Sequence, residues 1–236
     1  MTNSEASGDR LRPPGAFIVF EGGEGSGKST QSKRLAARLS GLGEDTLLTR
    51  EPGGTDGAEA IRTLLVTGKV ERWDAMTELL LINAARRDHV ERVIRPALNR
   101  GTHVICDRFL ASTIAYQGIA KGLGEALIRK MHQLAIGDLL PDLTVLMDIA
   151  PEIGLARAKN RFNHDDEAVQ ADRFEHHHLA FHRALRESFL DLATRDQHNH
   201  LVVDANVSMD DIAERIDAQI SQLLAARSQF AEAQEQ

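Results

Sequence analysis

The stretch Gly22-Gly23-Glu24-Gly25-Ser26-Gly27-Lys28-Ser29 decides the fold, because it matches the complete pattern G-x-x-x-x-G-K-[ST]. Before it, residues 17–20 are an apolar run that is typical of a buried strand. After it, residues 29–39 are rich in helix formers and contain no Gly or Pro. A strand, a glycine loop and a helix in this order are the context that the pattern requires. The alternative, a glycine-rich turn without a ligand, explains neither the full spacing nor the flanks.

The chemistry of this loop is anion binding. Glycines allow a tight turn in which several backbone N–H groups face one anion, and the helix N-terminus adds partial positive charge. Lys28 is expected to reach the β- and γ-phosphates of a nucleotide, and the Ser29 hydroxyl to ligate Mg²⁺. The loop alone does not distinguish a kinase from a motor or a switch.

Composition restricts the class of protein further. The 236 residues suit one or two domains, and a formal charge of -7 argues against a surface that coats nucleic acid. The single cysteine, Cys106, excludes a disulfide within the chain and suits a reducing cytoplasm. Hydropathy indicates no membrane span, and residues 1–14 lack the apolar core of a signal peptide. We therefore expect a cytoplasmic protein with one domain over residues 15–228, a disordered tail at 1–14 and a frayed tail at 229–236.

Five short apolar runs predict buried strands that alternate with helices. They cover residues 17–20, 45–49, 102–106, 143–148 and 201–203. Right-handed crossovers between parallel strands lead to a three-layer α/β/α sandwich around one sheet. A long helix is expected from residue 73 to 98, with Pro96 ending or kinking it, and a last helix from 209 to 226.

Charged residues end or directly follow three of the predicted strands, and ligands bind at the carboxyl ends of the strands in such sheets. Arg50 and Glu51 therefore contact a second ligand or form a solvated surface turn. Asp107 and Arg108 suit a site with Mg²⁺ and phosphate, or they form a pair that caps the next helix. Asp148 either lies near the nucleotide or caps the helix after it.

A basic helix, residues 154–161, precedes a polar and acidic segment without periodicity, residues 163–172. This combination predicts a lid of about residues 157–173 that closes over phosphates. The alternative is a charged face in contact with solvent.

Several further motifs, together with the glycine loop, resemble those of thymidylate kinases, in the order that the family has them over residues 16–226. They are Arg50-Glu51-Pro52-Gly53-Gly54-Thr55, Asp107-Arg108-Phe109, Ser112-Thr113-Ile114-Ala115-Tyr116-Gln117-Gly118, Pro141-Asp142-Leu143-Thr144 and Asp172-Arg173-Phe174-Glu175. The resemblance implies transfer of the γ-phosphoryl group of ATP to dTMP with Mg²⁺, a P-loop NTPase sheet of order 2-3-1-4-5, and a homodimer. Residues 23–26 include no basic residue and the basic charge lies in the lid, which resembles the bacterial type.

The resemblance also implies roles for individual residues. The implied catalytic residues are Lys28, Asp107, Arg108 and Arg161, with Ser29 and Asp107 at the metal. The implied ATP-binding residues are Gly22, Gly23, Glu24, Gly25, Ser26, Gly27, Lys28, Ser29, Thr30 and Arg157. The implied dTMP-binding residues are Glu24, Glu51, Pro52, Arg62, Ile82, Arg86, Arg108, Ser112, Thr113, Tyr116 and Gln117.

Within that set, Glu24 matches a contact to the 3′-hydroxyl, Arg108 one to the acceptor phosphate, and Arg86 one to thymine. Tyr116 matches a ring that crowds a ribose 2′-hydroxyl. One departure is Ile82, which stands where the family usually has a phenylalanine that stacks on thymine.

Two other functions compete with this interpretation. Another nucleoside monophosphate kinase would act on dUMP, CMP or GMP, against which Arg86 and residues 115–118 argue. A P-loop ATPase switch would need no acceptor site, so Arg62, Arg86 and Arg108 would have no ligand.

Overall fold

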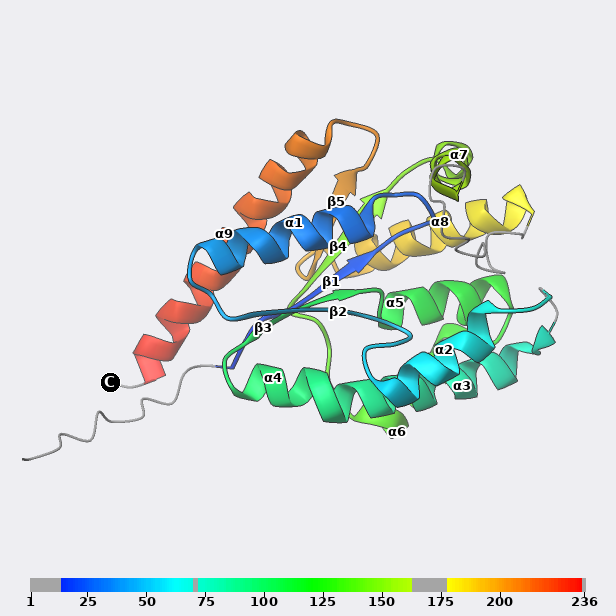
Figure 1. Ribbon diagram of the computed structural model, residues 1–236, viewed down its shortest axis with the longest axis horizontal. Helices are drawn as coiled ribbons and strands as arrows, with labels where there is room; N and C mark the ends of the chain where they lie inside the picture. The colour runs from blue at the N-terminus through cyan, green and yellow to red at the C-terminus, as the bar shows by residue number, and fades with distance from the viewer. Residues whose placement is uncertain (1–13, 70–71, 163–177, 235–236) are drawn as a thin grey trace, which may run out of the picture.

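A computed structural model describes residues 14–69, 72–162 and 178–234, and its centre is a five-stranded parallel sheet (Figure 1). The strand order is β2-β3-β1-β4-β5, which confirms the predicted order and the P-loop sandwich. The strands are β1 (Phe17–Glu21), β2 (Thr46–Arg50), β3 (His103–Asp107), β4 (Leu143–Asp148) and β5 (His200–Asp204). The helices are α1 (Lys28–Gly41), α2 (Asp56–Val66), α3 (Ala75–His89), α4 (Arg95–Asn99), α5 (Leu110–Thr113), α6 (Glu125–Ile136), α7 (Pro151–Phe162), α8 (Leu179–Arg195) and α9 (Met209–Gln234), with π-helical turns η2 (Val90–Ile94) and η3 (Ile114–Ala120).

Helices cover both faces of the sheet. Ile18 and Phe20 of β1 pack with α1 and α9 on one face, whereas Phe17 and Val19 pack with α3, α4 and α6 on the other. Neighbouring residues of a strand point to opposite faces, so a strand covered on both sides is apolar throughout. This explains why the three central strands, β1, β3 and β4, appear in the sequence as mainly apolar runs.

The carboxyl ends of the three central strands meet at one edge. Phe20 is in register with Asp107, and Glu21 with Leu146. The chain leaves β1 through a glycine loop that packs closely against α7. A Cβ at Gly25, whose φ is 64°, would lie 1.9 Å from the carbonyl oxygen of Gly154. Glycine is therefore required where the phosphate loop crosses the start of α7.

The long helix expected from residue 73 to 98 is present as α3, η2 and α4 in succession, which end at Asn99. Pro96 lies in α4, which directly follows the π-helical turn η2, so helical backbone continues past it. A second π-helical turn, η3, continues helix α5 as far as Ala120. Helix α9 runs to Gln234, beyond the expected end at residue 226.

Parts of the domain prediction lie outside the described residues. They are residues 1–13 of the expected N-terminal tail and residues 163–173 of the expected lid. The lid and the N-terminal tail therefore stay predictions. No helix in the described ranges has the length and apolar character needed to cross a membrane.

Candidate active site

The phosphate loop surrounds the ammonium group of Lys28. Lys28 Nζ lies 2.7 Å from the carbonyl oxygen of Gly23 and 3.4 Å from Ser26 Oγ. Burial, with a contribution from the positive charge of Arg108, lowers the pKa of Lys28 to about 8. Lys28 also begins helix α1, so the partial positive charge of the helix terminus and the lysine face the same anion site.

An oxygen pair lies beside this loop. Ser29 Oγ donates a hydrogen bond to Asp107 Oδ2 at 2.6 Å, which joins the start of α1 to the end of β3. Ser29 and its neighbour Thr30 are exposed. One hydroxyl and one carboxylate are the hard oxygen ligands that Mg²⁺ takes when phosphates and water complete its shell.

Arg108 is the second cation of the site, and its hydrogen bonds fix the position of its guanidinium group. Its Nη1 donates to the carbonyl oxygen of Gly22 and to Ser112 Oγ, both at 3.1 Å, and its Nη2 lies 2.5 Å from Glu24 Oε1. Tyr116 donates to the same Glu24 oxygen at 2.8 Å. Although burial raises the pKa of Glu24, the charges of Arg108 and Lys28 outweigh burial and lower it to about 2. Arg108 and Glu24 thus form an ion pair beside the phosphate loop.

A buried carboxylate, Glu21, supports the turn that carries Arg108, and the sequence analysis missed it. Its Oε1 accepts the N–H groups of Phe109 and Ser112 at 2.9 and 3.0 Å, and its Oε2 accepts the Ser112 hydroxyl at 2.5 Å. Burial raises the pKa of Glu21. The available signal was a carboxylate that directly follows a buried strand and precedes the glycine loop.

Replacing Glu21 should therefore affect stability in a way that depends on the replacement. Glu21→Ala removes the acceptor of two backbone N–H groups, and we expect it to lower the free energy of unfolding by about 2–4 kcal/mol. Glu21→Gln keeps one carbonyl oxygen for those N–H groups, and its amide can donate to the Ser112 hydroxyl. We expect a cost below about 1.5 kcal/mol for Glu21→Gln. Urea denaturation of both variants tests this, and equal losses would contradict it.

A second buried ion pair joins the loop after β2 to helix α3. Arg86 Nε donates to Glu51 Oε2 at 2.7 Å, and Arg86 Nη2 donates to Thr113 Oγ1 at 3.0 Å. The remaining nitrogen, Arg86 Nη1, is buried without a hydrogen-bond partner among the described residues. A buried donor without a partner is costly, so it indicates a place for an acceptor atom of a ligand.

The other expected site residues lie around these two ion pairs. Arg62 Nη1 donates to the carbonyl oxygen of Pro52 at 3.0 Å, and Ile82 is half-buried on α3. Gln117 is buried and donates to Glu78 Oε2 at 3.0 Å. Glu78 is a further residue that the sequence analysis did not single out.

Two expected residues lie on α7. Arg157 donates to the carbonyl oxygen of Ala205 at 2.8 Å and to Asn206 Oδ1 at 3.2 Å, so it meets the loop after β5. Arg161 lies near the end of α7, and its side chain is outside the described part of the chain.

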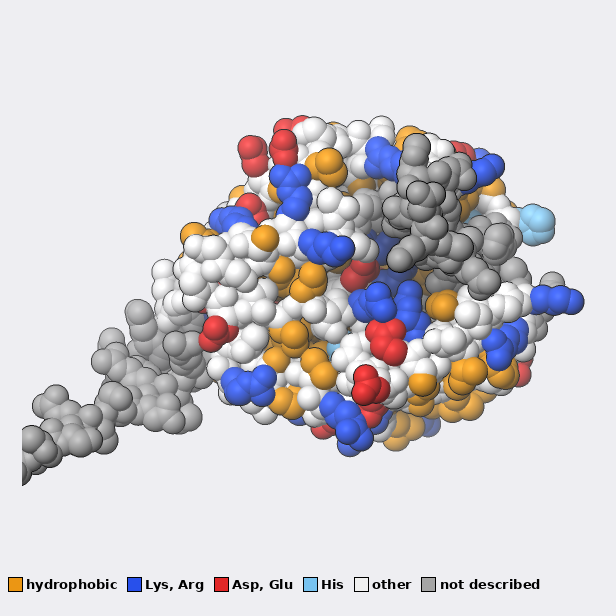
Figure 2. Space-filling model, viewed as in Figure 1, with side chains coloured by type: hydrophobic (Ala, Val, Ile, Leu, Met, Phe, Trp, Pro, Cys, Tyr) orange, Lys and Arg blue, Asp and Glu red, His pale blue; other side chains and the backbone are white. Residues whose placement is uncertain are grey.

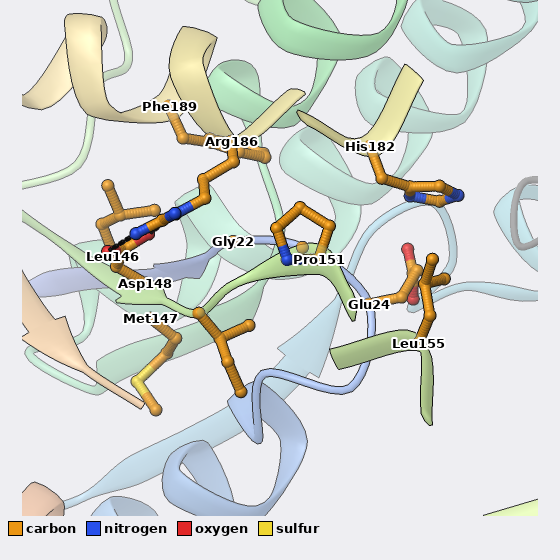
Figure 3. Close-up of a pocket in the computed structure, with 12 residues that line it drawn as sticks. Gly22, Glu24, Leu146, Met147, Asp148, Pro151, Leu155, His182, Arg186 and Phe189 are labelled. Atoms are coloured by element: carbon orange, nitrogen blue, oxygen red, sulfur yellow. Dashed lines mark hydrogen bonds and ion pairs between the residues drawn. The ribbon is translucent and has the colours of Figure 1, made fainter. Parts of the chain in front are cut away.

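Asp148 lies in a pocket between the phosphate loop and helix α8 (Figure 3). Arg186 of α8 binds both of its oxygens, at 2.7 and 2.8 Å. Glu24 and His182 line the same pocket. Of the two expected positions, Asp148 therefore lies close to the phosphate loop, where it anchors α8.

Charge is concentrated at this end of the molecule. Figure 2 shows Lys and Arg side chains grouped with acidic ones over the region where β2 and β3 end beside α5. Two cations, Lys28 and Arg108, donate to neighbouring carbonyl oxygens of the phosphate loop. Ser29 and Asp107 place a hydroxyl and a carboxylate beside the same loop. A P-loop fold with two cations and two oxygen ligands at the phosphate loop has the features of a phosphotransferase.

Comparison with known proteins identifies the particular family. The chain belongs to the thymidylate kinase family, whose profile matches residues 20–216. It is therefore a phosphotransferase, and the match supports the thymidylate kinase interpretation over the competing ones.

Individual relatives cover nearly the same length. The thymidylate kinase of Caulobacter vibrioides is 49% identical over 210 residues, which are 89% of this chain and 98% of that one. The thymidylate kinase of Dinoroseobacter shibae is 52% identical over 196 residues, covering 83% and 91%. The crystal structure of thymidylate kinase from Ehrlichia chaffeensis superposes with a TM-score of 0.69 at 34% identity, covering 88% of this chain and 99% of that one.

Proposed function

We propose that this chain transfers the γ-phosphoryl group of ATP to dTMP, giving dTDP and ADP, and so contributes to dTTP synthesis. The observation that supports it most is the position of Arg108, which binds the carbonyl oxygen of Gly22 in the phosphate loop itself. A phosphate bound by Arg108 would lie next to the γ-phosphate bound by Lys28. Alignment of the two phosphates and neutralisation of their charge are the main sources of catalysis in phosphoryl transfer.

The oxygen pair Ser29 and Asp107 would hold Mg²⁺. The 2.6 Å contact between their side chains shows that both reach the same point beside the phosphate loop. A bound Mg²⁺ supplies charge that neutralises the phosphate oxygens. We assign binding of the phosphate oxygens to Lys28, to the N–H groups of residues 22–30 and to Arg161. Arg157 would pack against the adenine.

The acceptor needs no strong base, because a phosphate oxygen is already a nucleophile. Arg108 binds the acceptor phosphate with support from Arg62, and Glu24 accepts a hydrogen bond from the 3′-hydroxyl. Arg86, whose buried Nη1 has no acceptor within the described ranges, faces the thymine. Tyr116 is held by Glu24 at 2.8 Å and crowds a ribose 2′-hydroxyl. The remaining proposed contacts to dTMP are Glu51, Pro52, Ile82, Ser112, Thr113 and Gln117.

We also propose a cytoplasmic homodimer. Leu64 of α2 and Met76 and Leu80 of α3 are 40%, 41% and 52% exposed, and Figure 2 shows hydrophobic side chains grouped over these helices. Apolar surface of this kind favours association. Light scattering coupled to size-exclusion chromatography should give twice the chain mass, and Leu80→Glu should shift the protein to the monomer mass.

Turnover with different acceptors tests the proposed reaction. ADP release is measured with ATP and Mg²⁺, using dTMP, dUMP, UMP, CMP and GMP as acceptors. We expect the highest kcat/KM with dTMP and much less with UMP, since its 2′-hydroxyl would meet Tyr116. ADP release that does not depend on the acceptor would contradict the proposal and indicate an ATPase.

A phenylalanine at position 82 should strengthen acceptor binding. Ile82 lies one helical turn before Arg86 on α3 and is half-buried. Stacking of an aromatic ring on a base contributes about 1–3 kcal/mol in other sites. We expect Ile82→Phe to lower the Kd for dTMP by about fivefold or more in calorimetry. An unchanged or higher Kd would contradict the expected contact with thymine.

A further inference from the structure

His89 is the last residue of α3 and is fully buried. It lies between Thr49, near the end of β2, and Glu51, in the loop after β2. Its Nε2 lies 2.7 Å from Thr49 Oγ1, and its Nδ1 lies 3.3 Å from Glu51 Oε1. The other oxygen of Glu51, Oε2, accepts the 2.7 Å bond from Arg86 Nε. A continuous chain of polar contacts therefore runs from Thr49 through His89 and Glu51 to Arg86.

The roles of the two ring nitrogens follow from the partners. Glu51 remains ionised beside Arg86, because the charge of Arg86 and the bond from His89 lower its pKa although burial raises it. An ionised carboxylate only accepts hydrogen bonds, so His89 Nδ1 must donate. In the neutral ring, Nε2 then accepts the hydroxyl of Thr49, which fixes the tautomer.

Independent geometry shows how tightly the ring is enclosed. A Cβ on Gly54 would lie 2.3 Å from His89 Nε2 and 2.4 Å from its Cδ2. The loop that carries Glu51 therefore closes onto His89 where only glycine fits. The imidazole cannot rotate without displacing this loop or breaking both of its hydrogen bonds.

This chain of contacts ends at Arg86 Nη1, the guanidinium nitrogen for which the described residues supply no hydrogen-bond partner. Glu51 and Thr113 bind Nε and Nη2 and so determine the plane of the guanidinium. Nη1 is then left as a donor in a fixed direction, buried and without a protein acceptor among the described residues. If Glu51 rotated, the plane of the guanidinium and the direction of Nη1 would change with it.

We propose that His89 is a positioning residue that orients Glu51 and, through it, the base-binding nitrogen of Arg86. The proposal rests on the proposed role of Arg86 toward the acceptor base. A donor held in one direction selects a pyrimidine with a carbonyl oxygen there and disfavours one with an amino group. His89 thereby contributes to the choice of dTMP over dCMP without touching either nucleotide.

Two amide variants separate this role from simple packing. In His89→Asn the amide nitrogen can take the position of Nδ1 and donate to Glu51, whereas in His89→Gln it can take the position of Nε2 and reach only Thr49. We expect His89→Gln to raise the KM for dTMP about tenfold and to reduce the dTMP over dCMP preference in kcat/KM by a similar factor. The KM for ATP and the kcat should change less than twofold, since only acceptor binding is affected.

His89→Asn should restore the KM for dTMP to within about threefold of the original chain. Equal KM values for dTMP in the original chain and in His89→Gln would overturn the proposal, as would parallel changes in the KM for ATP. If neither variant folds, Thr49→Val removes only the outer hydrogen bond and should raise the KM for dTMP about threefold. No change in Thr49→Val would then overturn the proposal. The original chain distinguishes the failure of the two proposals. If the original chain itself shows no preference for dTMP, the proposed kinase function is contradicted, whatever the His89 variants show.

Discussion

Replacing Arg108 with alanine or glycine is expected to lower kcat/KM for dTMP by about a thousandfold, the order of effect of removing a cationic group from a phosphoryl-transfer site. Arg108 joins the phosphate loop to the acceptor side through Gly22 and Glu24. The variants would then lack the main positive charge that neutralises the acceptor phosphate as the two phosphates approach. Arg108→Lys keeps the charge without the planar fork and should retain a small part of the activity.

The alanine and glycine variants of Arg108 should differ in their free energy of unfolding. Arg108 has a φ of 73°, which is a left-handed backbone conformation that residues other than glycine adopt at a cost in free energy. Both variants lose the same guanidinium contacts, so their difference isolates the backbone term. We expect Arg108→Gly to be more stable than Arg108→Ala by about 1 kcal/mol. Urea denaturation measures this, and an alanine variant of equal or greater stability would show that the backbone at 108 is not strained.

The sequence gives no sign of the left-handed backbone at Arg108, but it does predict the strands and the phosphate loop. The three central strands were predictable because burial on both faces makes each one a nearly continuous apolar run, as in residues 17–20, whereas β2 and β5 at the two sides of the sheet are only partly buried. The phosphate loop was predictable because only glycines permit its turns. Both signals are local, so a window of a few residues contains all of the information.

The supporting residues of the site gave no local signal. Glu21 accepts hydrogen bonds from residues about 90 positions away, and His89 contacts Glu51 across 38 positions. Their roles depend on which segments the fold brings together. The π-helical turns η2 and η3 were missed for a similar reason, since tertiary packing decides where one extra residue is accommodated.

Lys28→Met is expected to reduce kcat/KM for ATP by about a thousandfold. It should also abolish the fall of kcat/KM that we expect near pH 8 in the original chain. In the free protein the pKa of Lys28 is about 8, chiefly because of burial. A lysine that loses its proton no longer attracts the ATP phosphates. Since kcat/KM reports ionisation of the free enzyme, we expect kcat/KM for ATP to fall as pH rises through about 8.

Lys28→Arg is the matched control, because arginine stays protonated throughout this range. Its kcat/KM should be lower than that of the original chain at pH 7 but should show no fall near pH 8. A fall of the same size in Lys28→Arg would assign the titration to another group.

The same ionisation has an opposite effect on stability. The folded-state pKa of about 8 lies below the ordinary lysine value of 10.5, so the folded chain binds fewer protons than the unfolded chain between these values. Stability from this group therefore rises as pH increases from about 8 to 10.5, over the range in which ATP binding weakens. Lys28→Met should be more stable than the original chain at pH 7, and the difference should shrink above pH 8. Urea denaturation of both chains at pH 7 and 9.5 measures this difference in stability. A difference that does not change with pH would mean that burial does not destabilise the charged form of Lys28. The phosphate loop would then hold this charge at no cost to the fold.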